Sequence, residues 1–388
     1  MYILNNKELK EFCNKIKQSK ALGIDLEFIP ENTYYPALSL IQVSVNDTFK
    51  LIDPLKNLDL SPLFEIVADK EIVKIVHAGT QDMGIFFNLT SVIPKSVFDT
   101  QTASAFLDMG AQISYGAMVK ELFNVSLSKT EGFTNWMKRP LTNAQEKYAL
   151  EDVKYLLPAY KILVGRLKKL KRYDWLTEEL QKYESSSFYT LPLSKTLYKI
   201  KRRNQVEPKN AAILQQLAIW REQTARKINL PRKRVLHDDT LIEIAKICPK
   251  NENILINMRA LDLHNVKKHS KNILKAIKTG LKQKEIPSLH KNNNGQLSGR
   301  QKRLVEFLLF SLRAYCIKHK ISMQTVASRS DVEDFVRLAD NTDTEINHCT
   351  LMTGWRKDFA GSFLLQCLKG KIAFSLTPES GNIIFSQK

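Results

Sequence analysis

The sequence predicts an α/β domain, with a mixed sheet flanked by helices, followed by a basic half made of helices. In the first 170 residues, short apolar runs typical of strands alternate with segments of helical periodicity. Beyond about residue 208 the apolar residues recur at helical spacing. The charge also divides the chain, since residues 1–160 carry 16 basic and 19 acidic side chains whereas residues 161–388 carry 43 and 21.

Four strands and one long helix are expected in the first domain. The strands are apolar and β-branched runs bounded by turn-forming residues, and they span Leu22–Phe28, Leu38–Val45, Phe49–Ile52 and Ile72–His77. A helix is expected from Asn143 to about Leu170, where apolar residues follow Pro140 at helical spacing. Thr142 or Asn143 is its candidate N-cap.

Acidic residues stand at distinctive positions in three of these segments. Asp25 and Glu27 lie two residues apart in the strand GIDLEF, so both leave the same face. Asp82 follows a strand end in VHAGTQDMGIF. Tyr148 and Asp152 lie four apart on the predicted helix and therefore share one of its faces. Because carboxylates crowded in one cleft ionise together only when cations neutralise them, this set predicts a divalent-metal site.

Each signal alone has a structural alternative. Asp25 and Glu27 could be a solvated pair on an edge strand, and Asp82 could be a helix cap. Tyr148 and Asp152 could be surface residues of an amphipathic helix. In this order and with these flanks, the three segments resemble the exonuclease motifs of the DEDD superfamily, in the subtype with a tyrosine four residues before the last aspartate. Four further segments resemble those of the ribonuclease D family: TYYPALSLIQV, FDTQTASAFL, SKTEGFTNWMKRPLT and YALEDVKYLLPAY. The resemblance implies a ribonuclease H-like exonuclease fold and 3′–5′ exoribonuclease activity that releases 5′-monophosphates.

The resemblance also implies roles for single residues. Asp25, Glu27, Asp82 and Asp152 would hold two divalent cations, Mg²⁺ or Mn²⁺, since oxygen ligands suit hard ions. Tyr148 would orient the attacking water, because its ordinary pKa near 10 makes it a poor base at neutral pH. Candidates for substrate contact are Leu26, Phe28, His77, Gln81, Lys129, Trp136 and Arg139.

Several of these candidates have an equally good structural interpretation. Phe28 and His77 suit a core position, and Trp136 suits a packing anchor. The sequence also departs from the family pattern at residues 29–32, Ile-Pro-Glu-Asn, where many members carry a basic residue. A phosphate contact from that position is therefore not expected, and Gln81 stands where related sequences vary.

The basic half divides into two helical units. Residues 300–371 repeat residues 208–287 at an offset of about 91, with mostly apolar residues matched: Leu217, Ala225, Leu230, Val235, Leu241 and Ala245 fall on Leu308, Cys316, Ile321, Val326, Val332 and Val336. The segments WRE, RKINLPRKRVLHDDTLIEIA and GWRKDFAG resemble the helicase-and-RNase-D C-terminal (HRDC) domain, which occurs twice in some ribonucleases D.

The predicted domains follow from the repeat and from two polar stretches that contain proline. They are an exonuclease domain (1–170), a linker (171–207), a first HRDC-like domain (208–287), a linker (288–299), a second HRDC-like domain (300–375) and a tail (376–388).

The net charge of +22 over residues 161–388 predicts a nucleic-acid partner. Each cationic side chain that pairs with a phosphate releases a condensed counterion, and this release stabilises the complex. A membrane surface is the alternative anion, although no run approaches the roughly 18 apolar residues of a spanning helix. The family resemblance implies RNA with a 3′ end, transfer RNA precursors, and a monomer. Five cysteines without CxxC spacing and a start unlike an export signal favour a cytoplasmic location and no membrane partner.

Two other classes of function stay open. A DNA-directed 3′–5′ exonuclease would use the same acids, although no GxxxxGK[ST] phosphate loop accompanies them here. An RNA-binding adaptor with an inactive exonuclease body is the third possibility, but such a protein need not retain all five residues of the set.

Overall fold

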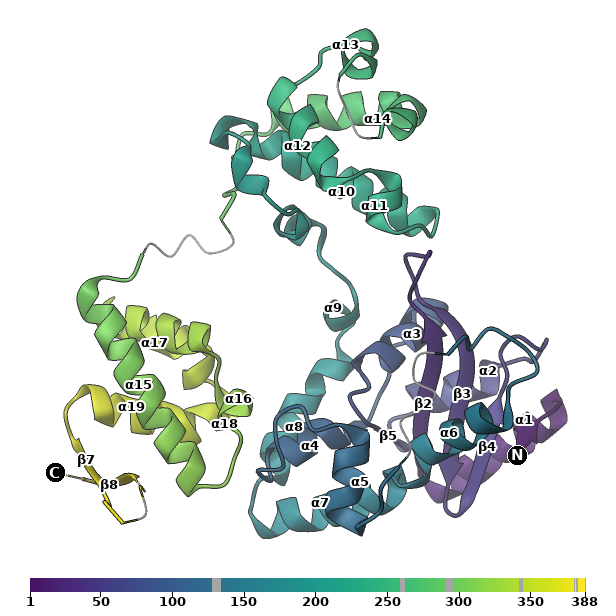
Figure 1. Ribbon diagram of the computed structural model, residues 1–388, viewed down its shortest axis with the longest axis vertical. Coiled ribbons are helices and arrows are strands. Elements are labelled where there is room, and N and C mark those ends of the chain that lie inside the picture. The colour runs from purple at the N-terminus through teal and green to yellow at the C-terminus, as the bar shows by residue number, and fades with distance from the viewer. Residues whose placement is uncertain are drawn as a thin grey trace.

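The computed structural model describes residues 1–127, 134–258, 262–290, 296–341, 345–379, 381 and 383–387. An α/β domain and two helical units make up the chain, with the first unit beyond one side of the α/β domain and the second beside α8 (Figure 1). Within the described residues, no helix is long and apolar enough to cross a membrane.

The α/β domain is built on a six-stranded mixed sheet in the order β1-β4-β3-β2-β5-β6. Its strands are β1 (Tyr2–Ile3), β2 (Ala21–Ile29), β3 (Ala37–Val45), β4 (Thr48–Ile52), β5 (Val73–Val76) and β6 (Val97–Asp99). The pairs β2–β3 and β3–β4 are antiparallel, and the other three pairs are parallel. The four predicted strands are confirmed to within one residue at each end. β1 and β6 were not predicted because two or three residues are too short to show a period of two.

Helices cover both faces of this sheet. α1 (Asn6–Ser19) packs on one face, and α6 (Asn143–Lys154) and α7 (Leu156–Lys169) pack on the other. A Cβ at Gly23 would lie 3.0 Å from Leu156 Cβ, so glycine lets α7 approach β2 two residues before Asp25. The remaining helices of the domain are α2 (Ser61–Ala68), α3 (Thr80–Thr90), α4 (Thr100–Ala105), α5 (Tyr115–Phe123), α8 (Tyr173–Leu180) and α9 (Ser186–Tyr189).

The long helix predicted from Asn143 to Leu170 is wrong, because it breaks at Tyr155 into α6 and α7. Thr142 is the N-cap as expected and forms a capping box with Gln145. The break has two causes. Pro158 has no N–H for the Lys154 carbonyl, and the Tyr115 hydroxyl lies between the Tyr155 N–H and the Glu151 carbonyl, 3.1 Å from each.

The predicted linker 171–207 is also wrong over most of its length. Leu176, Leu180 and Tyr183 are buried in the core of the α/β domain, which therefore extends through α8 and α9. Leu197 and Ile200 instead join the core of the first helical unit. Serines, a proline and basic residues are interspersed among the apolar residues of this stretch, which hid their burial.

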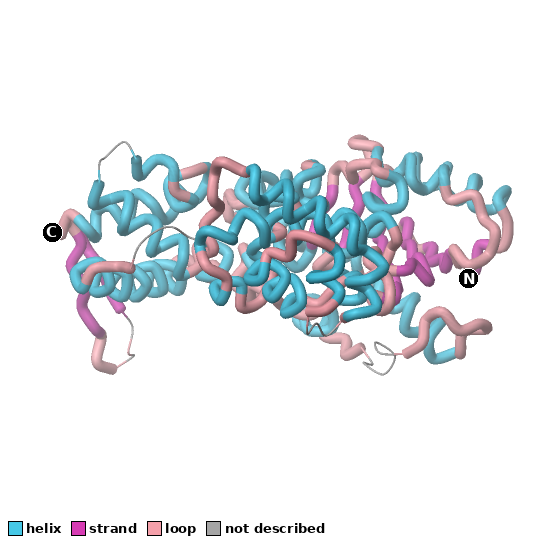
Figure 2. Tube along the Cα trace, turned by 90° about the horizontal axis from the view of Figure 1, so that it is seen from above, coloured by secondary structure: helices cyan, strands magenta, loops and turns pink. Residues whose placement is uncertain are grey.

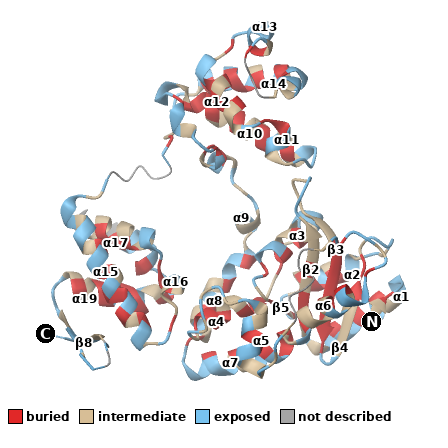
Figure 3. Ribbon diagram, viewed as in Figure 1, coloured by how far each residue is buried: buried red, intermediate tan, exposed pale blue. Residues whose placement is uncertain are grey.

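The first helical unit has its own hydrophobic core (Figure 3). It consists of α10 (Ala211–Lys227), α11 (Arg232–Val235), α12 (Asp238–Ile247), α13 (Glu252–Ile256) and α14 (Leu263–Lys282). Short 3-10 turns lead into it: η1 (Gln181–Glu184), η2 (Leu193–Lys195), η3 (Leu197–Lys199), η4 (Arg203–Gln205) and η5 (Pro208–Asn210).

The second helical unit has helices at the spacing of the first. It contains α15 (Gly299–Lys318), α16 (Met323–Val326), α17 (Arg329–Asn341), η6 (Glu345–His348), η7 (Thr350–Met352), α18 (Gly354–Arg356), a π-helix η8 (Lys357–Gly361) and α19 (Ser362–Leu368). α16 and α17 begin 91 residues after α11 and α12. Five of the six matched apolar pairs are buried in both copies, and Leu230, which is 37% exposed, is the exception.

The chain ends in a hairpin that the sequence analysis did not foresee. β7 (Ile372–Leu376) pairs antiparallel with β8 (Ile383–Gln387), at the end of the molecule opposite the N-terminus (Figure 2). The predicted boundary between an all-helical unit and a tail at 375/376 therefore cuts through β7. The alternation of Ile372, Phe374 and Leu376 was the available signal, and Phe374 packs against the core.

The second helical unit shares one continuous hydrophobic core with the α/β domain. Trp355 stacks on Trp175 of α8 with ring centroids 5.2 Å apart, and it meets Phe106 edge-on at 5.1 Å. Arg172, which is 7% exposed, donates to the carbonyls of Phe106 and Lys320 across this boundary. A truncation after residue 207 would therefore expose part of the α/β core.

We predict that Trp355→Ala destabilises the α/β domain and the second unit together. Removing a buried tryptophan costs about 3–5 kcal/mol, which a shift of one common thermal transition would report. Ile317→Ala, at a position 67% exposed on α15, is the control and should change the unfolding free energy by less than about 0.5 kcal/mol. If Trp355→Ala abolished only a separate minor unfolding transition and left the midpoint of the main transition unchanged, the shared core would be contradicted.

Candidate metal centre and active site

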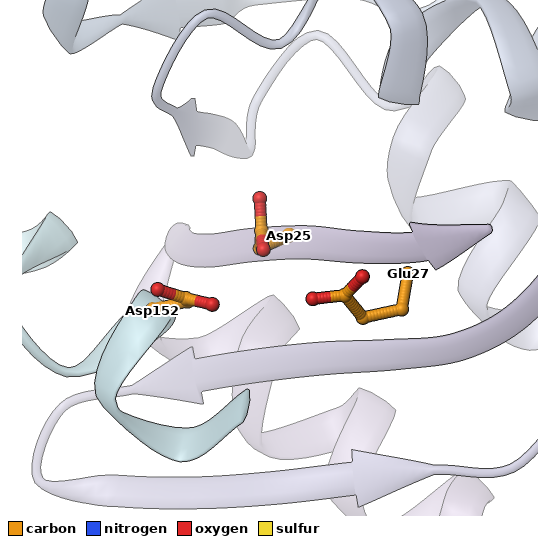
Figure 4. A group of neighbouring side chains, drawn as sticks. All are labelled: Asp25, Glu27 and Asp152. Carbon is orange, nitrogen blue, oxygen red and sulfur yellow. The ribbon is translucent and has the colours of Figure 1, made fainter. Parts of the chain in front are cut away.

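Asp25, Glu27 and Asp152 meet on the sheet face that α6 and α7 cover (Figure 4). One carboxylate oxygen from each lies within 4.8 Å of the others. β2 supplies Asp25 and Glu27 from one side, and α6 supplies Asp152 from the other. The carboxylates of Glu27 and Asp152 point toward one another. The structure thus brings three of the predicted metal ligands into one group.

Asp82 lies nearby but outside this group of three. It is in the first turn of α3 and is 7% exposed. Its charge contributes to a raised pKa of Glu27, and the charge of Asp25 helps to raise the pKa of Asp82. Asp82 is therefore within electrostatic range of the cluster, as a ligand to a second ion or to its water would be, and that role remains a prediction.

Asp99 fixes the turn that delivers Asp82. Its Oδ1 accepts hydrogen bonds from the N–H groups of Ala78 and Gln101, both at 2.9 Å, and its Oδ2 accepts one from the Tyr183 hydroxyl at 2.8 Å. Ala78 has a left-handed φ of 55°, a conformation that costs energy for a residue with a Cβ. The buried Asp99 carboxylate thus holds a strained turn between β5 and α3.

Tyr115 fixes the end of α6 that carries Asp152. Its hydroxyl donates to the Glu151 carbonyl and accepts from the Tyr155 N–H, which would be direct partners in an unbroken helix. The ring also meets His77 edge-on at 5.5 Å. Tyr115 therefore sets the direction in which the last turn of α6 presents Asp152.

Burial and mutual repulsion make the cluster a strong acceptor of positive charge. Burial raises the pKa of Asp25 to about 7, against a hydrogen bond from the Leu26 backbone that lowers it. Burial first, then the charges of Asp25, Asp152 and Asp82, raise the pKa of Glu27 to about 9. Burial and Asp25 raise the pKa of Asp152 to about 8. Near neutral pH these groups retain protons unless cations replace them.

The donor set fits divalent cations. All of its ligand atoms are carboxylate oxygens, which suit hard ions such as Mg²⁺ and Mn²⁺ better than Zn²⁺. Only a compensating charge makes such close carboxylates compatible with full ionisation. The acidic cluster is therefore suited to ions that also neutralise a phosphodiester.

Tyr148 stands one helical turn before Asp152 on α6 and is half-buried. Burial, with the charges of Asp152, Glu27 and Asp25, raises the pKa of its hydroxyl above the ordinary value. The hydroxyl therefore stays neutral, which agrees with the predicted role of orienting a water rather than removing its proton.

The predicted substrate-binding residues on β2, directly after β5 and on α3 have varied surroundings. Leu26 is buried in the core, Phe28 is half-buried against it, and Gln81 is exposed at the start of α3. His77 bonds through Nδ1 to the Thr100 hydroxyl and through Nε2 to the Ile113 carbonyl, both at 2.9 Å. Burial lowers the pKa of His77, so the ring is neutral. These bonds place His77 in the scaffold, and the predicted contacts of all four with substrate remain untested.

The segment before α6 shows a similar pattern. Trp136 is 2% exposed, and Lys129 lies outside the described residues. All five N–H bonds of Arg139 point to protein acceptors: the carboxylate of Asp53 and the carbonyls of Ser39, Trp136 and Lys138. Arg139 therefore ties this segment to β3 and β4, and its predicted grip on phosphate remains untested.

The sequence analysis missed Asp99, Tyr115 and Gln42. Gln42 is fully buried and pairs in register with Asp25, so both side chains leave the same sheet face. Within the described residues neither of its amide atoms has a hydrogen-bond partner. A lone glutamine in the apolar run SLIQV was the available signal, whereas Asp99 and Tyr115 act through backbone groups that no sequence pattern reveals.

Comparison with known proteins agrees with this geometry. Residues 1–168 match the family model described as 3′–5′ exonuclease, and residues 210–277 match that of the HRDC domain. The ribonuclease D of Bartonella henselae is 35% identical, and the match covers 93% of this chain and 88% of that protein. The ribonuclease D of Desulfotalea psychrophila is 34% identical, and the match covers 93% of this chain and 96% of that protein. The crystal structure of Escherichia coli RNase D superposes on this chain with a TM-score of 0.81 and 27% sequence identity. The superposition covers 95% of this chain and 98% of the Escherichia coli chain, which is described as an exoribonuclease involved in structured RNA processing.

We predict that the thermal stability of the metal-free protein falls as pH rises from about 5 to about 9. A carboxyl whose pKa is higher when folded than when unfolded binds more protons in the folded state, so its contribution to stability is lost as pH rises through that window. The folded values of about 7, 9 and 8 define its upper end. Melting curves in EDTA should show the decline, and saturating Mn²⁺ should remove it.

The matched variant for this measurement is Asp25→Asn with Glu27→Gln. It lacks two of the repelling charges, so its melting temperature in EDTA should depend less on pH than that of the wild type. Equal slopes in the two proteins would mean that other groups cause the decline.

We predict that Tyr115→Phe lowers kcat and costs about 1–3 kcal/mol of stability, because it leaves the Tyr155 N–H and the Glu151 carbonyl without their bridging hydroxyl. Steady-state rates and thermal melts measure the two effects. Tyr160→Phe on α7, whose ring packs edge-on against Phe98, is the control. A loss of stability with kcat unchanged would show that the hydroxyl does not direct Asp152.

Proposed function

This chain belongs to the ribonuclease D family and is a 3′–5′ exoribonuclease that uses divalent metal ions, and from this premise we propose that it trims the 3′ ends of transfer RNA precursors. In this proposal two ions, Mg²⁺ or Mn²⁺, are held by Asp25, Glu27, Asp82 and Asp152. The observation that carries it is the group of Asp25, Glu27 and Asp152, with one oxygen of each within 4.8 Å of the others.

The chain's own residues have distinct tasks in this chemistry. Bound ions supply the acidity that makes a water nucleophilic and the positive charge that stabilises the leaving 3′ oxygen. Asp25 and Glu27 present their carboxylates from one strand face, opposite Asp152, so that a terminal phosphodiester lies between strand and helix. Tyr148 orients the attacking water through its neutral hydroxyl. The carboxylates release their protons on binding cations, so the rate of cleavage increases as the pH rises through neutrality.

Three observations support a structured RNA substrate. Residues 161–388 carry a net charge of +22, which favours a polyanion. An HRDC domain follows the exonuclease domain, and the similar Escherichia coli protein is described as acting in structured RNA processing. We place the activity in the cytoplasm, where thiols stay reduced, because all five cysteines are free. One chain supplies the three clustered acids, which suits a monomer.

We predict that Asp25→Ala and Asp152→Ala each lower exonuclease activity by more than about two orders of magnitude. The assay follows shortening of RNA with a single-stranded 3′ tail, with DNA of the same sequence in parallel and EDTA as a further arm. RNA binding and the folded state should persist in both variants, because the basic half is untouched.

Asp47→Ala is the matched control, since Asp47 is an exposed acid at the β3–β4 turn. It should keep full activity. Undiminished cleavage by Asp25→Ala or Asp152→Ala would overturn the metal assignment, and a preference for DNA would overturn the RNA substrate.

A further inference from the structure

The two helical units dock on the exonuclease domain through equivalent corners, each formed where the unit's long first helix turns into its short second helix. At the first corner the Asn229 carbonyl accepts a hydrogen bond from the Tyr34 N–H of the β2–β3 loop, at 3.3 Å. At the second, the Lys320 carbonyl accepts one from Arg172 at 2.8 Å. Asn229 and Lys320 are 91 residues apart and have left-handed φ values of 49° and 50°. The two units therefore offer the carbonyl of the same repeat position to the exonuclease domain.

A cavity lies between the exonuclease domain and each corner. The one at the first corner, here called the junction pocket, has a volume of about 430 Å³. The β2–β3 loop lines it with Thr33, Tyr34 and Tyr35, and the corner lines it with Pro231, Arg232 and Lys233. In Figure 1 the tip of this loop reaches toward the end of α11.

The two corners differ in charge where they are equivalent in sequence. The residues 91 positions after Pro231, Arg232 and Lys233 are Ser322, Met323 and Gln324, and these line the second cavity. The second unit therefore docks without cations at these three positions. Arg226 and Arg232 take part in docking through the Tyr34 hydroxyl, and their Nη1 groups and Lys233 remain available for another purpose.

A buried carboxylate holds two of these cations in place. Glu222 is 1% exposed and accepts hydrogen bonds from the Tyr34 hydroxyl, Arg226 and Arg232. Both arginines use Nε and Nη2 for their contacts, and among the described residues neither Nη1 has a partner. With Lys233 exposed beside them, three cations face one carboxylate. The pocket is therefore prepared for an anion with several oxygen acceptors.

Aromatic rings accompany the cations. Tyr35 meets Tyr34 edge-on with ring centroids 4.8 Å apart, and it is only half-buried. Tyr189, another lining residue, stacks on Phe87 at 5.0 Å. Rings beside cationic groups are typical of sites for single-stranded nucleic acid, where bases stack and phosphates pair with the charges.

The pocket is also within reach of a strand whose end lies at the metal centre. Glu27 and Thr33 are six residues apart along β2 and the loop that follows it. Six residues span at most about 20 Å, which corresponds to about six nucleotides of a stacked strand at about 3.4 Å each. One RNA strand can therefore occupy both sites.

We propose that the junction pocket binds the RNA substrate a few nucleotides before its 3′ end. Arg226, Arg232 and Lys233 contact a phosphate, and Tyr35 stacks on a base. The proposal rests on the proposed function, because the strand in the pocket is the one whose 3′ end reaches the acidic cluster. Substrates too short to span both sites gain nothing from the pocket.

Two variants test this in the full-length protein: Lys233→Gln, which copies the residue of the second corner, and Tyr35→Ala. With a single-stranded RNA dodecamer, KM should rise about fivefold for Lys233→Gln and about tenfold for Tyr35→Ala, with kcat within about twofold of the wild type. With a trinucleotide, both constants should stay unchanged. Lys233→Gln should also reduce the salt dependence of dodecamer binding by about one charge.

Lys278→Gln is the matched control, since Lys278 is exposed on α14 of the same unit. An equal rise in KM for this control would show diffuse charge attraction and overturn the site. So would equal losses on the trinucleotide and the dodecamer. Weakened binding of nucleoside 5′-monophosphate, with dodecamer binding intact, would make the pocket a product site instead.

Binding of the dodecamer by Asp25→Asn protein, with and without Lys233→Gln, separates this proposal from the proposed function. A wild type that cleaves no RNA would overturn the function. A fivefold loss of affinity in the Asp25→Asn background would still support the pocket, and an unchanged affinity would overturn it.

Discussion

The structure depends on the enforced closeness of carboxylates that repel one another. Asp25, Glu27 and Asp152 are held with oxygens within 4.8 Å, in surroundings that raise the pKa of each. Left free, such groups would separate or stay protonated. Two hydrogen-bond centres prevent separation: the buried Asp99 holds the turn that delivers Asp82, and the half-buried Tyr115 holds the end of α6. The repulsion they resist gives the site its affinity for divalent cations.

The helical units extend this catalytic body in different ways. The second shares its hydrophobic core through Trp355 and Trp175, so it is part of the same folded body. The first keeps a separate core and meets the exonuclease domain through the polar network around Glu222. At the corner itself the second copy has the uncharged residues Ser322, Met323 and Gln324, where the first has Pro231, Arg232 and Lys233.

Features that depend on neighbouring residues were predicted from the sequence, whereas features that depend on contacts between distant residues were not. Asp25 and Glu27 were predictable because a strand's period of two places them on one face, and Thr142 because an N-cap is local. The break at Tyr155 was missed because one of its causes, Tyr115, lies 40 residues away. Arg139 was a candidate for phosphate binding from its segment alone, but its guanidinium bonds to Ser39 on β3, to Asp53 just after β4 and to carbonyls of its own segment.

The sequence by itself determined the strands of the central sheet, the acidic motifs, the asymmetry of charge and the repeat of 91 residues. These features are encoded in periodicity, composition and spacing, which are properties of neighbouring residues. Only the tertiary structure decided that three acids converge, that α8 belongs to the catalytic body, and that one corner forms a basic pocket with the β2–β3 loop. Each depends on contacts between residues far apart in the chain, whose free energy comes from burial and charge in the folded state.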